Sequence, residues 1–154
     1  MRITIAAVGR LRKGPAHELC QTYLRRIDWP VRVIEVEVPH QRETSVRRKR
    51  EGERLLRAIN EAERVIMLDE RGESVASTDF ARRLGTWADD GVREIAFVLG
   101  GADGLDAAVR ACADWTIAFG AMTWPHELAR VMLIEQIYRA RTIMTHHPYH
   151  RGGE

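Results

Sequence analysis

Apolar runs with strand spacing alternate with segments of helical spacing along the whole chain. The segments 2–9 and 31–39 alternate apolar and polar side chains, a period-two pattern that predicts strands. The runs "RVIMLD", "REIAFVLGG" and "DWTIAFG" predict three further strands, at residues 64–69, 93–101 and 114–120. Helical patterns predict five helices between and after these strands, at residues 15–27, 44–59, 77–91, 105–113 and 124–144.

Several predicted helix ends carry residues that are typical of such ends. Pro15 stands at the first position of its helix, where a missing N–H costs nothing. Thr44 or Ser45 is expected to cap the second helix, and Ser77 or Thr78 the third. Gly91 is expected to end the third helix, since glycine adopts the left-handed conformation of helix ends.

The alternation of strands and helices predicts an α/β protein with a mostly parallel sheet flanked by helices. Continuous apolar runs such as "IAFVLG" are typical of strands that helices cover on both faces. We find no internal repeat, linker or low-complexity segment in the 154 residues, so one domain spanning residues 1–154 is expected.

Composition narrows the class of protein only slightly. No apolar run approaches the roughly 20 residues that a membrane-spanning helix needs. The N-terminal run alternates like a strand and no cleavage site follows it, so we expect a cytoplasmic protein without a signal peptide. The net charge is +2, but Lys13 and Lys49 are the only lysines among 24 basic residues. Arginine stacks on bases and holds phosphates with a planar fork, which weakly favours a nucleic-acid partner.

The segment "VLGGADGL", residues 98–105, leads from a buried strand through glycines into a helix. Glycines let a ligand approach the backbone closely, and a helix N-terminus offers free N–H groups. A tight strand-to-helix turn without a ligand would show the same pattern. The first strand is not followed by a dinucleotide fingerprint, and the chain holds no Walker A sequence.

The segment "FGAMTWPHE", residues 119–127, is a second glycine-bearing loop at the end of a strand. Its residues predict an apolar cup with exposed backbone groups, suited to an adenine or a thioether. Two such loops at neighbouring strand ends favour a pocket, because ligands of open α/β sheets bind beyond the carboxyl ends of strands. An ordinary loop with a buried tryptophan is the alternative.

The last predicted helix has apolar residues on two sides. Leu128, Leu133 and Ile143 belong to one side, and Ile134 and Tyr138 to the other, with arginines between them. A surface helix normally has one apolar stripe, so the second side needs another partner. A second copy of the chain related by two-fold symmetry would supply it. Burial of the helix inside one domain is the alternative.

Two polar segments are candidates for contacts with phosphate. The basic start of the second helix, "SVRRKRE", could hold nucleic-acid phosphates, but a solvated face balanced by Glu43, Glu51 and Glu53 is the simpler interpretation. The tail "HHPYHR", residues 146–151, combines a ring for stacking, imidazoles for proton transfer and a guanidinium for phosphate. The spacing of its histidines does not favour a metal site. Alone, the tail could also be disordered.

Together these segments resemble the SPOUT-class ribosomal RNA large subunit (pseudouridine-N3) methyltransferase H family. The resemblance covers essentially the whole chain, and its most specific segments are "TWPHELARVMLIEQIYRA" and "HPYHR". It implies a C-terminal trefoil knot, a homodimer, and methylation of N3 of a pseudouridine in large-subunit ribosomal RNA, with assembled ribosomes as the expected substrate. It implies no metal and no membrane partner.

The resemblance also implies S-adenosylmethionine as methyl donor and assigns residues to the site. The tail residues Tyr149, His150 and Arg151 are implied to act on the target nucleotide across the dimer. His150 is expected to help remove the N3 proton, with Glu135 and Arg139 as weaker candidates for a role. The cofactor is implied to contact residues on three strand ends: Leu68, Gly100, Gly101, Gly120, Ala121, Met122, Thr123, Trp124 and Pro125.

The chain departs from the family pattern at three positions. Ala102 and Asp103 stand where the family commonly has Pro and Glu, and His146 where it often has Asn. Two other functions remain as alternatives. A non-enzymatic ribosome-binding or RNA-binding protein could keep the fold without the chemistry. A nicotinamide-binding or nucleotide-binding enzyme would need the phosphate fingerprints that the chain lacks.

Overall fold

Five parallel strands form one sheet in the computed structural model, which describes residues 1–149. The strands lie in the order β2-β1-β4-β3-β5, and every pairing is parallel. Their bounds are Arg2–Val8 (β1), Val31–Val36 (β2), Arg64–Ser74 (β3), Glu94–Leu99 (β4) and Trp115–Ala118 (β5). The predicted α/β class with a parallel sheet is therefore confirmed, while the trefoil knot stays a prediction.

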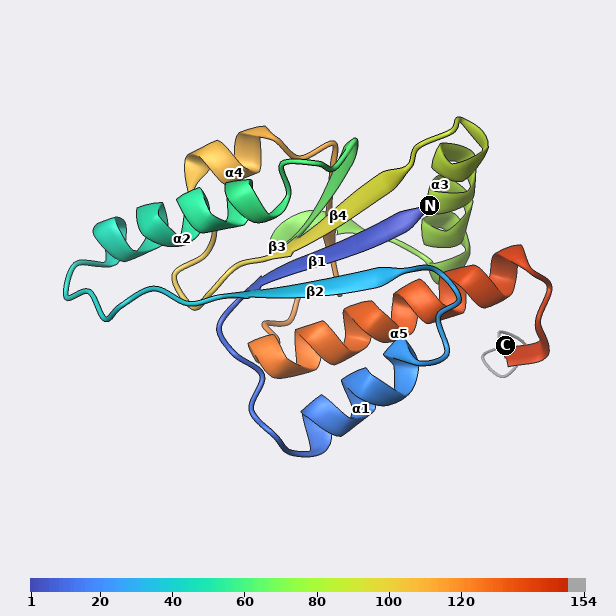
Figure 1. The fold of residues 1–154 in the computed structure, drawn as a ribbon, viewed down its shortest axis with the longest axis horizontal. Helices are drawn as coiled ribbons and strands as arrows, with labels where there is room; N and C mark the ends of the chain where they lie inside the picture. The colour runs from blue at the N-terminus through green and yellow to red at the C-terminus, as the bar shows by residue number, and fades with distance from the viewer. Residues whose placement is uncertain (150–154) are drawn as a thin grey trace.

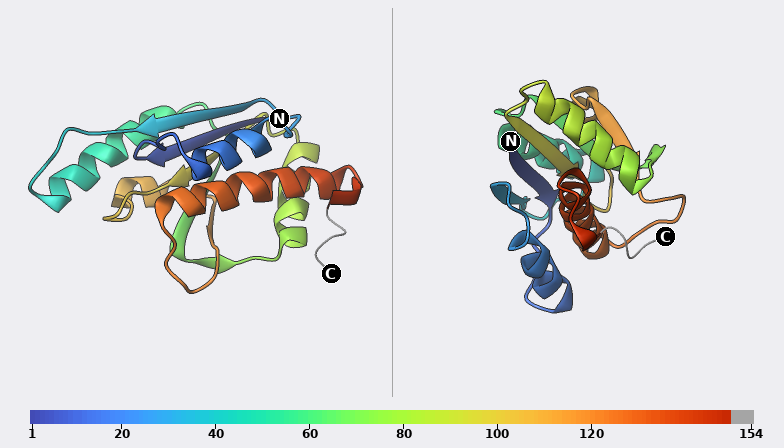
Figure 2. Two further views of the ribbon diagram at one scale, coloured as in Figure 1. Left: turned by 90° about the horizontal axis from the view of Figure 1, so that it is seen from below. Right: turned by 90° about the vertical axis from the view of Figure 1, so that its right-hand side faces the viewer.

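Helices cover both faces of the sheet (Figures 1 and 2). On one face α1, α3 and α5 pack around a core centred on Ile5, Phe97 and Ile137. On the other face α2 and α4 pack against Met67 and Val98. The helices span Pro15–Leu24 (α1), Thr44–Ala58 (α2), Ser77–Asp89 (α3), Ala107–Ala111 (α4) and His126–Met144 (α5).

The central strand β4 shows why the continuous apolar run predicted a strand covered on both faces. All six of its residues are buried. Phe97 belongs to the core beneath α3 and α5, and Val98 to the core beneath α2 and α4. Burial of a side chain of this size stabilises the fold by about 2 kcal/mol.

The helix ends differ in part from the sequence prediction. Gly91 has φ +83° directly after the end of α3, as predicted. The predicted caps of α2 and α3 are wrong by one residue or two. Glu43 and Ala76 occupy the cap positions, and neither forms a side-chain capping hydrogen bond. Thr44 and Ser77 adopt helical conformation, so each is the first residue of its helix and not the cap.

Strand β3 extends five residues beyond the predicted end, and its extension crosses β5. Leu68 and Glu73 both align with Ile117, so the residues between them bulge out of the ladder. At this crossing Gly72 lies directly on the backbone of Ile117. A Cβ atom at Gly72 would lie 2.5 Å from the Ile117 carbonyl carbon and 2.7 Å from its nitrogen. Only glycine allows so close an approach of two backbones.

Helix α5 lies on the sheet between α1 and α3, and it is enclosed along most of its length. Within the described part of the chain no residue from 129 to 144 is exposed. Leu133, Ile134, Ile137 and Ala140 are completely buried, although the sequence pattern put Leu133 and Ile134 on different sides. The neighbouring helices thus cover much of both apolar sides within one chain. No helix of residues 1–149 has the length and apolar character to cross a membrane.

Candidate functional site

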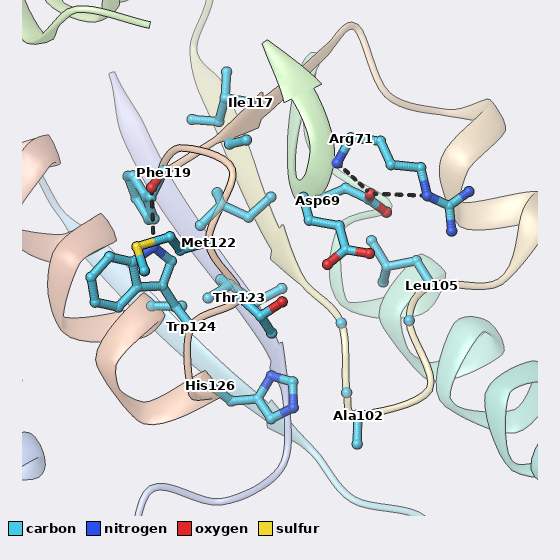
Figure 3. A pocket seen from close by; sticks show the side chains of 18 of the residues that line it. Asp69, Arg71, Ala102, Leu105, Ile117, Phe119, Met122, Thr123, Trp124 and His126 are labelled. Atoms are coloured by element: carbon cyan, nitrogen blue, oxygen red, sulfur yellow. Dashed lines mark hydrogen bonds and ion pairs between the residues drawn. The ribbon is translucent and has the colours of Figure 1, made fainter. Parts of the chain in front are cut away.

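A cavity of about 230 Å³ lies beyond the carboxyl ends of β4 and β5 and beside the bulge of β3 (Figure 3). These three strands are neighbours in the sheet, so the loops that follow them meet at one edge. We call this cavity the strand-end cavity. Its wall consists of Leu68–Arg71 within β3, residues 99–105 apart from Asp103 at and after the end of β4, residues 117–124 apart from Ala121 at and after the end of β5, and Arg110, His126 and Ala129.

Seven of the nine residues that the resemblance assigned to a cofactor line this cavity. They come from three loops: Leu68, Gly100, Gly101, Gly120, Met122, Thr123 and Trp124. Ala121 and Pro125 belong to the same loop as the last four but are not part of the wall. The structure therefore brings together loops that are separated by up to about fifty residues in the chain.

The glycine loop after β4 is compact, and a side chain would not fit at two of its glycines. A Cβ atom at Gly100 would lie 2.9 Å from Leu105 Cγ, and one at Gly101 would lie 2.8 Å from Val8 Cγ1. Gly104 has φ +75° and donates its N–H to the Gly101 carbonyl oxygen at 3.0 Å. The loop thus folds on itself and presents backbone to the cavity.

Helix α2 holds the glycine loop from behind. Arg47 Nε donates to Asp103 Oδ2 at 2.7 Å, so the aspartate that departs from the family pattern anchors the loop to α2. Glu51 is buried beside the same loop, and burial raises the pKa of its carboxyl group. Among residues 1–149, Glu51 Oε2 has no hydrogen-bond partner. One residue of the basic segment, Arg47, therefore has a structural role in the loop.

The loop after β5 forms the apolar side of the strand-end cavity. Gly120 has φ +90°, which turns the chain sharply after the strand. Trp124 Nε1 donates to the Phe119 carbonyl oxygen at 3.0 Å and closes the loop, as Figure 3 shows. Met122 is 75% exposed and Trp124 is 39% exposed, although apolar side chains of this size are usually covered. The loop therefore offers apolar surface to a ligand.

The polar side of the cavity was not predicted from the sequence. Asp69 accepts the N–H of Arg71 at 3.0 Å (Figure 3), and Arg110 Nη2 lies 3.4 Å from Asp69 Oδ2. Glu70 also lines the cavity. Asp69, Glu70 and Arg71 belong to the segment "LDERG", residues 68–72, but only their place at the bulge of β3 could have assigned them to the site.

Tyr149 follows α5 in the chain and packs against this helix, and it is not part of the wall of the strand-end cavity. Its hydroxyl donates to Glu135 Oε1 at 3.0 Å, and Arg139 holds the same oxygen at 2.7 Å. The Tyr149 ring packs on Tyr138, with ring centroids 4.7 Å apart. Glu135 comes six residues after Ala129, the last residue of α5 in the cavity wall, so this contact lies about 9 Å along the helix from the cavity. The predicted residues His150 and Arg151 lie outside the described residues.

We expect Tyr149 to ionise at a higher pH than an ordinary tyrosine. Burial is the largest cause of its raised pKa, followed by hydrogen bonds with Tyr23 and Glu135. The folded chain holds this proton more tightly than the unfolded chain. The resulting stabilisation is therefore full below the ordinary pKa of 10.0 and is lost as the pH rises toward the raised value.

An alkaline titration that follows tyrosinate absorbance would measure this shift. Tyr149→Phe should remove the component that titrates last, and Glu135→Gln should lower the pKa of Tyr149. The interpretation is wrong if Tyr149→Phe removes a component that titrates near the ordinary value.

Residues 1–149 contain no group of three His, Cys, Asp or Glu side chains placed to hold a metal ion. The two glycine loops follow β4 and β5, which were expected to be neighbours but have β3 between them. The parallel sheet, these loops and the shared cavity define a class of ligand-binding α/β protein. A family model described as "Predicted SPOUT methyltransferase" matches residues 1–150. The chain belongs to this SPOUT methyltransferase family.

Relatives with assigned names are similar to the chain over its full length. Ribosomal RNA large subunit methyltransferase H of Rhodospirillum centenum is 51% identical, with 99% of this chain and 100% of the relative covered. The protein of that name from Paramagnetospirillum magneticum is 46% identical, with 98% and 99% covered. Among solved structures, a probable methylase family protein from Haemophilus influenzae Rd KW20 has a TM-score of 0.62 at 10% identity. That match covers 96% of this chain and 69% of the other, and it shows a shared fold.

Proposed function

We propose that this chain uses S-adenosylmethionine to methylate N3 of a pseudouridine in large-subunit ribosomal RNA. It would act in the cytoplasm, as a homodimer, on assembled ribosomes. The observation that carries the proposal is the strand-end cavity, which gathers the glycine and apolar loops of three adjacent strands. Support comes from the full-length relatives, which are named ribosomal RNA large subunit methyltransferase H.

The residues of the strand-end cavity fit S-adenosylmethionine. Leu68, Leu105 and Trp124 provide apolar walls for an adenine, and the loops beside them expose backbone donors and acceptors for its ring nitrogens. Asp69 and Glu70 add carboxylate groups to the same cavity, and these can accept hydrogen bonds from hydroxyl or ammonium groups of a ligand. When bound, S-adenosylmethionine supplies a methyl group on a positively charged sulfur.

The target nitrogen must lose a proton as it receives the methyl group. N3 of pseudouridine forms its bond to the methyl carbon as the carbon–sulfur bond breaks, and the N3 proton passes to a base. The target nucleobase must also leave its stack in the RNA to reach the cavity. The protein contributes by holding nitrogen and methyl carbon in line at short distance.

We assign the proton transfer to the tail of the partner subunit. Tyr149 is held on α5 at Glu135, away from the strand-end cavity of its own chain. A two-fold partner could instead bring its tail to this cavity. There His150 would accept the N3 proton, Tyr149 would orient the base, and Arg151 would hold a phosphate.

Replacing Gly101 by valine should weaken binding of S-adenosylmethionine by more than about tenfold. The new side chain would begin 2.8 Å from Val8 Cγ1 and would push the glycine loop out of place. Isothermal titration of the variant with S-adenosylmethionine measures the effect. Gly85→Ala is the control, because a Cβ atom there would lie 3.7 Å from Met144 Cε, an ordinary contact. Unchanged affinity in Gly101→Val would contradict the assignment of the cavity.

The proposed function is tested by methyl transfer from labelled S-adenosylmethionine to ribosomes from cells that lack this gene. We expect label in one pseudouridine of the large-subunit RNA, located by mass spectrometry. Free ribosomal RNA and isolated large subunits, tested in parallel, would show which substrate is used. Saturable binding of S-adenosylmethionine without label in any ribosomal RNA would contradict the proposed substrate and support the proposed cofactor.

A further inference from the structure

A second cavity, of about 940 Å³, opens beside the β1–α1 connection. We call it the β1–α1 cleft. Its wall includes Arg10, Arg12 and Lys13 from the connection, Glu35 from β2 and Arg130 from α5. In Figure 1 the connection leaves the end of β1 and passes the first turns of α5 before α1 begins. None of these residues has a part in the proposed methyl transfer.

Arg130 forms the floor of the cleft and is 4% exposed. Its Nη1 lies 2.5 Å from Glu35 Oε1, and its Nη2 donates to the Gly9 carbonyl oxygen at 2.8 Å. Its buried Nε has no acceptor among residues 1–149. A guanidinium is rarely buried without a full set of partners, because an unmade hydrogen bond to a charged group is costly. The floor therefore holds a cation with an unused donor.

The same network fixes the connection above the floor. The N–H of Leu11 donates to Glu35 Oε1 at 2.7 Å, and the Leu11 side chain is buried in the core. Because Leu11 points inward, the residues on either side of it are directed away from the core. Arg10, Arg12 and Lys13 are all exposed. We call these three residues the basic rim.

The charge of the β1–α1 cleft is positive. Four cationic side chains and two carboxylates line it, and Arg130 already neutralises one of the carboxylates, Glu35. Across the described chain, no salt bridge involves a member of the basic rim. Their charges therefore remain available to an anionic partner.

The β1–α1 cleft is next to the strand-end cavity. Ala129 lines the strand-end cavity and Arg130, the next residue, lines the cleft. Strand β1 pairs with β4, so the basic rim and the glycine loop follow adjacent strands at one edge of the sheet. An RNA strand that inserts a base into the strand-end cavity would have its neighbouring phosphates within reach of this edge.

We propose that the basic rim binds backbone phosphates of the RNA whose base enters the strand-end cavity. The proposal rests on the proposed function for the identity of the RNA. Phosphate contacts of this kind fix the register of the strand and carry no sequence information. The rim would thus position the target nucleotide, while the cavity and the tail act on it.

The test compares the triple variant R10A/R12A/K13A with wild type in methyl transfer to ribosomes over a range of salt concentrations. We expect KM for ribosomes to rise about tenfold or more at low salt. The slope of log KM against log salt should become shallower by about 2, because each lost phosphate contact to a single strand removes about 0.7. Affinity for S-adenosylmethionine should not change.

The matched control is R25A/R57A/R93A, which removes the same charge at the opposite edge of the sheet. These arginines are exposed, at the ends of α1 and α2 and before β4. The control should keep the KM and the salt slope of wild type. Equal effects in the two variants would overturn the proposal, as would an unchanged salt slope in the rim variant.

Filter retention of ribosomes that carry labelled large-subunit RNA separates this proposal from the proposed function. If wild type transfers no methyl group but retains RNA better than the rim variant, the proposed reaction fails and the rim assignment stands. Equal retention by wild type and rim variant overturns the rim assignment, whatever the outcome of methyl transfer.

Discussion

Replacing Gly72 by alanine is expected to lower the melting temperature by roughly 10 °C, from a loss of about 3 kcal/mol in unfolding free energy. The new methyl group would lie 2.5 Å from the carbonyl carbon of Ile117. No side-chain movement can relieve this contact, because the three nearest atoms all belong to the backbone of Ile117. One of the two crossing segments must therefore move. Since residues 69–71 line the strand-end cavity, affinity for S-adenosylmethionine should fall as well.

Gly85→Ala serves as the control for this experiment. Gly85 lies within α3, where alanine is favoured over glycine by about 1 kcal/mol. The new methyl group would make only an ordinary contact with Met144. Thermal unfolding should therefore show Gly85→Ala at or above the wild-type melting temperature. If Gly72→Ala also unfolds at the wild-type temperature, Gly72 and the backbone of Ile117 are not in close contact.

The second large effect is expected from His150. Replacing it by alanine should lower kcat by about 10²–10⁴-fold, as for loss of a general base. Binding of S-adenosylmethionine should remain nearly unchanged, because the strand-end cavity of the same chain would be intact. Single-turnover methyl transfer and cofactor titration measure the two quantities. Parallel loss of both would show that His150 supports the cofactor instead.

Mixing two inactive variants would show which subunit supplies the tail. In a heterodimer of His150→Ala and Gly101→Val, the first chain keeps its cavity and the second keeps its tail. If the tail acts across the dimer, random pairing should restore about one quarter of wild-type turnover. If each tail acts on its own chain, every site in the mixture has one defect. The mixture would then be no more active than its components.

The element order and the strand-end cavity could be predicted because their signals are local. Each strand is an apolar run between polar segments, and the glycines of two loops stand directly at strand ends. Once the strands are parallel, the loops that follow neighbouring strands must meet at one edge. No long-range information was needed beyond the order of the strands.

Other features depend on contacts between distant segments and left no local signal. The segment after Asp69 is polar and ends the apolar run, yet β3 continues to Ser74 because it pairs with β5. Arg130 was expected between the two apolar sides of its helix, but it is buried by its contacts with Glu35 and Gly9. The second apolar side of α5 was ascribed to a second copy of the chain, with burial inside one domain as the alternative, and α1 and α3 cover much of both sides.

The length of α5 has a consequence for how the chain can vary. The helix begins at the strand-end cavity with His126 and holds Tyr149 through Glu135. One residue inserted into α5 after Glu135 would turn everything that follows it by about 100° and shift it by about 1.5 Å. Tyr149 would lose Glu135, and the tail would leave in another direction. Insertions and deletions should therefore be tolerated in the surface loops but not within α5, which acts as a spacer of fixed length.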